Sequence, residues 1–248
     1  MTKSETPVAW VTGSTRGIGK SCAKWFAING YSVVVHGRDE GQAEQVAEEF
    51  RRSHGRDVLV VAGDISDASW PSEAVKQIHS KFGRLDVLVA NAGLHHASPI
   101  SMVQNATVDL IIDTNVKGTY LTVQHASRLM RRSPRSSVVV IGSVMGDNGV
   151  SGQVLYSMSK AAVRGLVVAS SRELASQNTR VNGVLPGYVS TDMSAGLSDE
   201  MKAEIISGIS LRRFADSDEI AEVVGFLTSE KSDYITGQLL TIDGGIFK

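Results

Sequence analysis

Tyr156 and Lys160 lie four residues apart, and a tyrosine and a lysine at this spacing suggest acid–base chemistry. On a helix the two side chains share one face, so the ammonium lies beside the phenol and favours its ionised form. A unit charge about 5 Å away, at an effective dielectric constant of about 20, supplies roughly 3 kcal/mol, or about two pKa units. Because a free phenol titrates near ~10, we expect the pKa of Tyr156 to lie close to working pH.

The same pair also arises by chance on solvated helices, so its interpretation depends on the rest of the chain. Ser143 follows a run of apolar residues and a glycine, and it adds a hydroxyl upstream of the pair. We therefore ask which elements would bring these three side chains to a bound ligand.

A glycine-rich loop between a strand and a helix lies near the start of the chain. The apolar run Val8–Val11 leads toward Gly13, Gly17 and Gly19, and residues 20–28 have a helical pattern. Glycines permit a tight turn and close approach of the backbone, while the helix N-terminus directs free N–H groups at a pyrophosphate. The spacing is Gly-x3-Gly-x-Gly, which differs from the usual dinucleotide fingerprint. A glycine turn without a ligand is the alternative.

The segment Gly19-Lys20-Ser21 also resembles the end of a P-loop, the phosphate-binding motif of many ATPases. That motif needs a further glycine at position 14, where this chain has Ser14. The sequence therefore argues against phosphoryl transfer.

The second apolar run, Ser32–His36, is followed by Gly37, Arg38 and Asp39. In dinucleotide-binding folds this position meets the adenosine ribose, where an acid accepts the 2′-OH of NAD and an arginine accommodates the 2′-phosphate of NADP. We favour Arg38 over Asp39, because Arg16 in the glycine loop can add a second positive charge to the same phosphate. The alternative is that both arginines are solvated surface residues.

Short apolar runs alternate with helical patterns along the whole chain, which indicates a parallel sheet covered on both faces. The expected strands are Val8–Val11, Ser32–His36, Val58–Val61, Val87–Ala90, Val138–Ile141, Val181–Leu185 and Leu239–Ile242. The expected helices span 20–28, 40–55, 70–82, 102–132, 156–177 and 216–228. Ligands of such sheets bind beyond the carboxyl ends of the strands, which is where Gly13, Arg38, Asp64 and Asn91 fall.

Two segments lie outside this regular alternation. Residues 188–210 are less regular and form a plausible lid over a substrate. Residues 165–169, in the middle of the helix that carries Tyr156 and Lys160, are apolar nearly all round. Such a helix is expected to be buried against another helix or another subunit.

Composition excludes several classes of protein. The chain has 248 residues, of which 42% are hydrophobic, and a formal net charge of -1, so it offers a sizeable core and no basic field for nucleic acid. Its one cysteine, Cys22, excludes an internal disulfide and a cysteine-cluster metal site, and we predict no metal. No signal-like segment and no membrane-spanning apolar run is evident. We expect a soluble cytoplasmic protein.

Taken together, the motifs resemble those of the short-chain dehydrogenase/reductase family, in order and across almost the whole chain. The matching residues are Thr12-Gly13-x3-Gly17-Ile18-Gly19, Asp64, Asn91-Ala92-Gly93, Asn115, Ser143, Tyr156-x3-Lys160, Pro186-Gly187 and Thr191. The resemblance implies one Rossmann-type α/β domain over residues 1–248, with a doubly wound, mostly parallel seven-stranded sheet, and usually a homotetramer. Within the family, residues 156–160 and the segments Tyr234–Gln238 and Asp243–Gly245 look most like those of 3-oxoacyl-[acyl-carrier-protein] reductases of fatty acid biosynthesis.

The resemblance also implies a role for each motif. Tyr156 would give its proton to a carbonyl oxygen that Ser143 hydrogen-bonds, while the nicotinamide delivers hydride to the carbon. Lys160 would keep Tyr156 acidic and bind the nicotinamide ribose, and Asn115 would hold a water that replaces the proton. The NADP(H) site would be lined by Gly13, Thr15, Arg16, Gly17, Ile18, Gly19, Arg38, Asp64, Ile65, Asn91, Ala92, Gly93, Tyr156, Lys160, Pro186, Gly187, Val189 and Thr191.

Three functional classes remain after this reading. The first is NADPH-dependent reduction of a ketone, expected to be a 3-oxoacyl thioester on an acyl carrier protein. The second is the same machinery acting on another ketone or secondary alcohol, such as a sugar, steroid or quinone. The third is a catalytically silent nucleotide-binding protein, which the intact Asn115, Ser143, Tyr156 and Lys160 disfavour.

Two charged clusters have less definite roles. His95 and His96 follow the Asn91-Ala92-Gly93 turn, and we favour a loop surface over a place at the substrate mouth. Arg131, Arg132 and Arg135 precede the strand that ends at Ser143, and Arg172 lies twelve residues beyond Lys160. Arginines in these places resemble the carrier-docking arginines of 3-oxoacyl reductases and are expected to flank the cleft. The alternative is solvated helix ends that complement the helix dipole.

Overall fold

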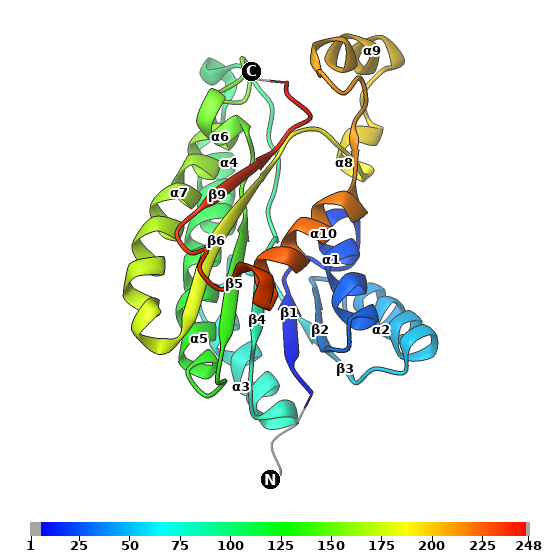
Figure 1. Cartoon of the computed structure of the whole chain (residues 1–248). Coiled ribbons are helices and arrows are strands. Elements are labelled where there is room, and N and C mark those ends of the chain that lie inside the picture. The colour runs from blue at the N-terminus through cyan, green and yellow to red at the C-terminus, as the bar shows by residue number, and fades with distance from the viewer. Residues whose placement is uncertain (1–5, 247–248) are drawn as a thin grey trace.

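The computed structural model describes residues 6–246, which form a seven-stranded parallel sheet between two layers of helices (Figure 1). The strands follow the order β3-β2-β1-β4-β5-β6-β9. They are β1 (Val8–Val11), β2 (Ser32–Gly37), β3 (Val58–Ala62), β4 (Val87–Ala90), β5 (Ser136–Ile141), β6 (Thr179–Pro186) and β9 (Leu239–Ile242). All seven predicted strands are confirmed. The order reverses between β1 and β4, and crevices for ligands open at such a switch point.

Both faces of the sheet are apolar, and successive residues of a strand point to opposite faces. In β1, Ala9 and Val11 pack against α1, α2 and α10, whereas Val8 and Trp10 pack on the face covered by α3, α5 and α7. The helices are α1 (Gly17–Ile28), α2 (Glu40–His54), α3 (Trp70–Phe82), α4 (Asn105–Ile112), α5 (Thr119–Met130), α6 (Met145–Asn148), α7 (Val154–Leu174), α8 (Asp192–Ala195), α9 (Asp199–Gly208) and α10 (Ser217–Thr228). Within residues 6–246, no helix combines the length and apolar character needed to cross a membrane.

The single long helix predicted over 102–132 is wrong. The segment holds a 3-10 turn (Ile100–Met102), α4, a π-helical turn (Asp113–Gly118) and α5. The π turn packs tightly, because a Cβ at Gly118 would lie 2.3 Å from Ile65 Cγ1. Such turns carry one extra residue, and they frequently occur at functional sites. Here the turn contains Asn115.

The lid-like segment 188–210 contains two short helices and one strand of a small two-stranded sheet. Its strand β7 (Val189–Ser190) pairs in parallel with β8 (Ala215–Asp216). Helix α9 buries none of its described residues and stands apart from the sheet at the end where the predicted site lies (Figure 1). The start of the segment is anchored, because the Gly187 N–H donates to the Ile242 carbonyl of β9 (2.8 Å).

Candidate active site

The glycine loop between β1 and α1 is a cradle that side chains would fill. Gly13 has φ +62°, and a Cβ there would lie 3.0 Å from Ala92 Cα. A Cβ at Gly19 would lie 2.2 Å from the Gly13 carbonyl oxygen. Helix α1 begins at Gly17, so its first N–H groups have no partner within the helix and face the loop. This geometry fits a bound pyrophosphate.

Asn91 at the end of β4 ties this loop to the sheet. Its Nδ2 donates to the carbonyl oxygens of Thr12 (2.9 Å) and Gly13 (3.1 Å). In return, the backbone N–H groups of Asn91 and Ala92 donate to Thr12 Oγ1 (2.9 and 3.0 Å). Since both amide hydrogens of Asn91 are used within the protein, its side chain holds the loop in shape, and the loop backbone remains for the ligand.

At the end of β2, the structure distinguishes Arg38 from Asp39 as the candidate contact for the adenosine ribose. Asp39 is the N-cap of α2, where its Oδ1 accepts from the Gln42 N–H (2.8 Å). Arg38 is exposed and makes no ion pair with another described residue. Gly37 lies close to the glycine loop, since a Cβ there would lie 2.5 Å from Thr15 Cγ2. Thr15 and Arg38 therefore lie at neighbouring turns, and the Asp39 carboxylate is already engaged.

Among the other residues predicted for the cofactor, some side chains face the site and two do not. Asp64 is half-buried beyond β3 and accepts from the N–H and Oγ of Ser66 (2.9 and 2.8 Å). Thr191 lies near the glycine loop, because a Cβ at Gly17 would be 3.3 Å from its Cγ2. Ile65 and Val189 instead bury their side chains in the core. Only the backbone of these two residues is left to line a ligand.

Asn115 is brought beside Lys160 by the π turn. Its Nδ2 donates to the Leu94 carbonyl (2.8 Å) and to Ser159 Oγ (3.0 Å), and its Oδ1 accepts from the Leu94 N–H (2.8 Å). A Cβ at Gly93 would lie 3.2 Å from Asn115 Oδ1 and 3.4 Å from Lys160 Nζ. Gly93, Asn115 and Lys160 thus meet at one point. No motif in the sequence pointed to Ser159, which joins Asn115 to the helix that carries Tyr156.

Ser143, Tyr156 and Lys160 converge beyond the end of β5. Tyr156 and Ser143 are hydrogen-bonded through their side chains. Lys160 Nζ donates to the Ile141 carbonyl (3.0 Å) and lies 6.0 Å from the centroid of the Tyr156 ring. All three side chains are buried. The structure therefore brings the predicted acid, its hydroxyl partner and its cation together.

The expected fall in the pKa of Tyr156 is wrong for this structure. Burial raises the pKa of the Tyr156 phenol above its usual value, and the hydrogen bond with Ser143 lowers it only in part. Burial also lowers the pKa of the Lys160 ammonium to about 8. Desolvation disfavours the charged form of each group, and it is the largest cause of both shifts. At neutral pH the phenol keeps its proton.

His95 lies at the mouth of this site, which the sequence did not favour. The side chain is exposed on a loop, as predicted, yet its ring stands edge-on to Tyr156 with 4.8 Å between centroids. His95 Nε2 is 3.2 Å from Gln153 Oε1, at the start of α7. Only its position two residues after Gly93 could have indicated this placement.

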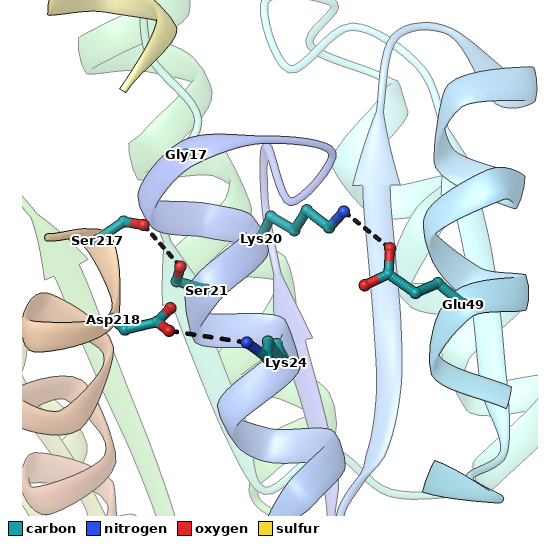
Figure 2. A pocket seen from close by; sticks show the side chains of 7 residues that line it. All are labelled: Gly17, Lys20, Ser21, Lys24, Glu49, Ser217 and Asp218. Carbon is teal, nitrogen blue, oxygen red and sulfur yellow. Dashed lines mark hydrogen bonds and ion pairs between the residues drawn. The ribbon is translucent and has the colours of Figure 1, made fainter. Parts of the chain in front are cut away.

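The residues that resembled a P-loop point away from the cradle. A hollow of about 270 Å³ on the outer side of α1 is lined in part by Lys20, Lys24 and Ser21. Figure 2 shows their side chains reaching toward Glu49, Asp218 and Ser217. Lys20 Nζ pairs with Glu49 (2.8 Å), Lys24 with an acid of α10, and Ser21 Oγ is 2.8 Å from Ser217 Oγ. These side chains join α1 to α2 and α10, so the phosphoryl-transfer reading has no geometric support.

Three of the four arginines expected to flank the cleft lie at the other end of β5, and the fourth, Arg172, lies in the last turn of α7. Arg131 and Arg132 follow the end of α5, and Arg135 precedes the start of β5, whereas Ser143 follows the opposite end of that strand. Six residues of extended strand span roughly 20 Å. Arg135 is also paired with Glu230 and Asp233 (3.4 and 2.8 Å). The prediction was wrong because it inferred nearness in space from nearness in sequence. The three arginines and Ser143 lie at opposite ends of β5.

Comparisons with known proteins cover the whole chain. A family model described as Enoyl-(Acyl carrier protein) reductase matches residues 13–247. The 3-oxoacyl-[acyl-carrier-protein] reductase FabG of Staphylococcus aureus (strain N315) is 40% identical over 248 residues, covering 100% of this chain and 99% of the relative. A short-chain dehydrogenase/reductase from Serratia marcescens BCRC 10948 matches with a TM-score of 0.91 and 32% identity over 98% of each chain.

A further solved structure is that of YwfH, an NADPH-dependent reductase involved in bacilysin biosynthesis. It matches with a TM-score of 0.92 and 28% identity, over 98% of this chain and 99% of YwfH. The parallel sheet, the glycine cradle and the group around Tyr156 are thus found in a chain that is similar over its full length to members of one family. The chain belongs to the short-chain dehydrogenase/reductase family.

Proposed function

We propose that this oxidoreductase uses NADPH to reduce the ketone of a 3-oxoacyl thioester, carried on an acyl carrier protein, to a secondary alcohol. The observation that carries the proposal is the hydrogen-bonded pair of Ser143 and Tyr156, with the Lys160 ammonium behind it. Two hydroxyl donors meet where a carbonyl oxygen would develop negative charge. The name and full-length similarity of the Staphylococcus relative support the thioester over other ketones.

In the proposed reaction, the carbonyl carbon would receive a hydride, which NADPH would supply when bound. Tyr156 transfers its phenolic proton to the carbonyl oxygen, and Ser143 donates a hydrogen bond to that oxygen. The charge left on Tyr156 is stabilised by the Lys160 ammonium, which lies 6.0 Å from the ring centroid. Hydride and proton together convert the ketone to an alcohol, so no other reactant is needed.

Tyr156 must then regain a proton through the buried group behind it. Both amide hydrogens of Asn115 are used, on Leu94 and Ser159. Its Oδ1 accepts one hydrogen bond, from the Leu94 N–H, and keeps a second lone pair. We assign to this acceptor the water that the family resemblance implies beside Asn115.

The cofactor would lie along the carboxyl edge of the sheet. The backbone of the Gly13–Gly19 loop and the start of α1 would hold the pyrophosphate, and Lys160 the nicotinamide ribose. Arg38, which is exposed and unpaired among the described residues, would hold the 2′-phosphate of NADP, with Arg16 as a second positive charge. Arg16 is also free to move, because its contact with Asp192 is 3.8 Å long and both side chains are over 70% exposed. The segment 188–210 would close over the substrate.

We also propose that the enzyme is a cytoplasmic homotetramer. A groove of about 520 Å³ between α5 and α7 supports this assembly, because it is lined by Val116, Tyr120, Ala162, Leu166 and Ala169. Its rim exposes Tyr120 (51%) and lies near Met158 (53%) on α7. A groove with small and apolar residues suits the helices of a second copy.

The function is tested by NADPH oxidation with purified protein and a panel of acceptors. We expect the highest kcat/KM with an acetoacetyl group on acyl carrier protein, a lower value with the same group on a small thiol, and little turnover of simple sugars, steroids or quinones. A crotonyl thioester serves as control for reduction of a carbon–carbon double bond. Higher kcat/KM for a free ketone, or for the crotonyl thioester, would overturn the proposal.

A further inference from the structure

One buried histidine, His36, lies where three segments of the nucleotide-binding edge meet. It is the fifth residue of β2, after an otherwise apolar run of valines, and it is 2% exposed. A polar side chain buried to this degree must satisfy its hydrogen-bonding groups inside the protein. The partners of His36 are therefore informative about what it does.

His36 holds the first two residues of the glycine loop. Its Nδ1 accepts from the Gly13 N–H (2.9 Å). Its backbone N–H donates to Ser14 Oγ (2.8 Å), and its carbonyl oxygen accepts from the Ser14 N–H (2.8 Å). Gly13 has positive φ, which glycine adopts without strain, and these bonds tie the turn to β2.

The other ring nitrogen of His36 reaches the end of β3. Nε2 is 3.0 Å from the Gly63 carbonyl oxygen. Because Nδ1 accepts a hydrogen bond, the ring proton must sit on Nε2, which then donates to Gly63. Gly63 immediately precedes Asp64. A single neutral tautomer thus links the glycine loop to the segment of Asp64, which is predicted to line the cofactor.

Trp70 covers the imidazole on one face. The two ring centroids are 4.4 Å apart, and Trp70 Nε1 donates to the Ala62 carbonyl (2.8 Å), so the indole itself is fixed. Burial lowers the pKa of His36 to about 4, although the bond to Gly63 and the nearby Asp64 act in the opposite direction. The neutral form therefore persists at neutral pH. Protonation would remove the acceptor for Gly13.

We propose that His36 is a positioning residue for the adenosine and pyrophosphate part of the nucleotide, because it fixes the Gly13–Ser14 turn relative to Gly63 and Asp64. The inference rests on the proposed NADPH cofactor. His36 needs no contact with the cofactor itself. When a tie of this kind is lost, a smaller fraction of molecules holds the binding-competent loop, and the apparent Kd rises by the inverse of that fraction.

Two substitutions separate hydrogen bonding from packing. His36→Phe keeps an aromatic ring against Trp70 and loses both side-chain hydrogen bonds. His36→Asn loses the ring and the bond to Gly63 but places an amide oxygen near the position of Nδ1, where it accepts from Gly13, so it retains one of the two side-chain bonds. Trp70→Phe is the matched control, since it disturbs the packing and leaves the His36 side chain its bonds to Gly13 and Gly63.

The measurement is equilibrium binding of NADPH, followed by nucleotide fluorescence without substrate. We expect His36→Phe to raise Kd about tenfold with kcat at saturating NADPH within about twofold of wild type, and both His36→Asn and Trp70→Phe to stay closer to wild type. A Kd unchanged in His36→Phe, or raised equally in all three variants, would refute the positioning role. Wild-type protein that binds no NADPH would instead refute the proposed function, and this inference with it.

A measurement on wild-type protein covers the case in which His36→Phe does not fold. Amide hydrogen exchange at Gly13 should be slow, because the N–H is held by a buried acceptor. Its protection factor, which corrects for the slower intrinsic exchange at low pH, should fall as the pH is lowered toward 4, before the protection of the core amides of β1 changes. Exchange at Gly13 as fast as at an exposed loop amide would also refute the positioning role.

Discussion

The protonation states of Tyr156 and Lys160 suit the direction of reduction. Burial raises the pKa of the Tyr156 phenol, so it carries the proton that a ketone needs. Burial lowers the pKa of Lys160 to about 8, and the side chain still carries its charge at neutral pH. A protonated acid beside a cation is therefore the resting state through the neutral range.

The first prediction concerns the acid. Tyr156→Phe should lower kcat by about 100-fold or more, because general acids usually contribute at least that factor. The Kd for NADPH should change little, since the hydroxyl acts on the substrate oxygen. Steady-state kinetics and direct nucleotide binding measure the two effects separately. Retention of a tenth of the wild-type activity or more would contradict the assigned role.

The second prediction concerns pH. The reduction rate should fall as pH rises through about 8, because Lys160 then loses the charge that stabilises developing phenolate. The pH profile of kcat/KM for reduction measures this loss. The pKa of Lys160 is lower in the folded state than in the unfolded chain. Between a pH of about 8 and the ordinary value of 10.5, the unfolded chain therefore binds more protons than the folded protein. The contribution of Lys160 to the free energy of unfolding thus rises with pH in this range. Unfolding driven by Lys160 therefore cannot explain the lost activity.

Lys160→Arg provides the control for that profile. Arginine remains charged throughout this range, so the variant should lose the decline near pH 8 even if its overall rate is lower. A wild-type profile that stays flat to pH 9, or a decline that persists unchanged in the arginine variant, would show that another group titrates.

At the scale of elements, the two charged residues in the turn from β2 into α2 have different roles. Asp39 caps the helix and Arg38 faces outward. The third prediction is that Arg38→Asp raises the Kd for NADPH far more than that for NADH, because a carboxylate then opposes the 2′-phosphate. Asp39→Ala should leave the nucleotide preference intact and lower the unfolding free energy by about 1 kcal/mol through loss of the cap. Nucleotide titrations and denaturant melts measure the two effects. A preference reversed by Asp39→Ala would reassign the ribose contact.

The sequence predicted those elements whose signal is local. Buried parallel strands are runs of apolar residues, so β1 to β6 and β9 could be predicted. The glycine loop could also be predicted, because the spacing of its glycines is set by a single local turn. The π turn at Asn115 differs from an α-helix by a single residue in its hydrogen bonds, and no pattern of side chains distinguishes the two. The π turn was therefore missed.

Features that depend on distant partners escaped prediction for a different reason. Ile65 and Val189 were placed by motif, but which way a side chain points depends on the register of the strand or turn that carries it. His36 reads as one polar residue at the end of a strand, and its meaning comes from Gly13 and Gly63, which only the folded sheet brings together.

At the scale of the whole molecule, the opposite ends of the sheet have different characters. The carboxyl ends of the strands carry the proposed active site, and the amino ends carry Arg131, Arg132 and Arg135. A carrier protein that docks on those arginines would sit about the length of a strand from Ser143 of the same subunit. Assembly therefore matters for the proposed substrate.

The fourth prediction concerns assembly. Ala162→Arg places a large charged side chain in the groove between α5 and α7, and it should convert the proposed tetramer into smaller species in light scattering. Ala162 is exposed in the single chain, so the fold itself should persist. Ala203→Arg, on the exposed face of α9, is the matched control and should leave the mass unchanged. A wild-type monomer, or a tetramer that tolerates the groove variant, would contradict the proposal.

The anchoring of Gly187 by Ile242 has a consequence for biosynthesis. Every residue proposed for catalysis and cofactor binding leaves the ribosome before β9, yet the carbonyl that fixes the start of the substrate segment belongs to that last strand. Nascent chains that already contain Tyr156 and Lys160 therefore lack this one anchor of residues 188–210 until β9 pairs with β6.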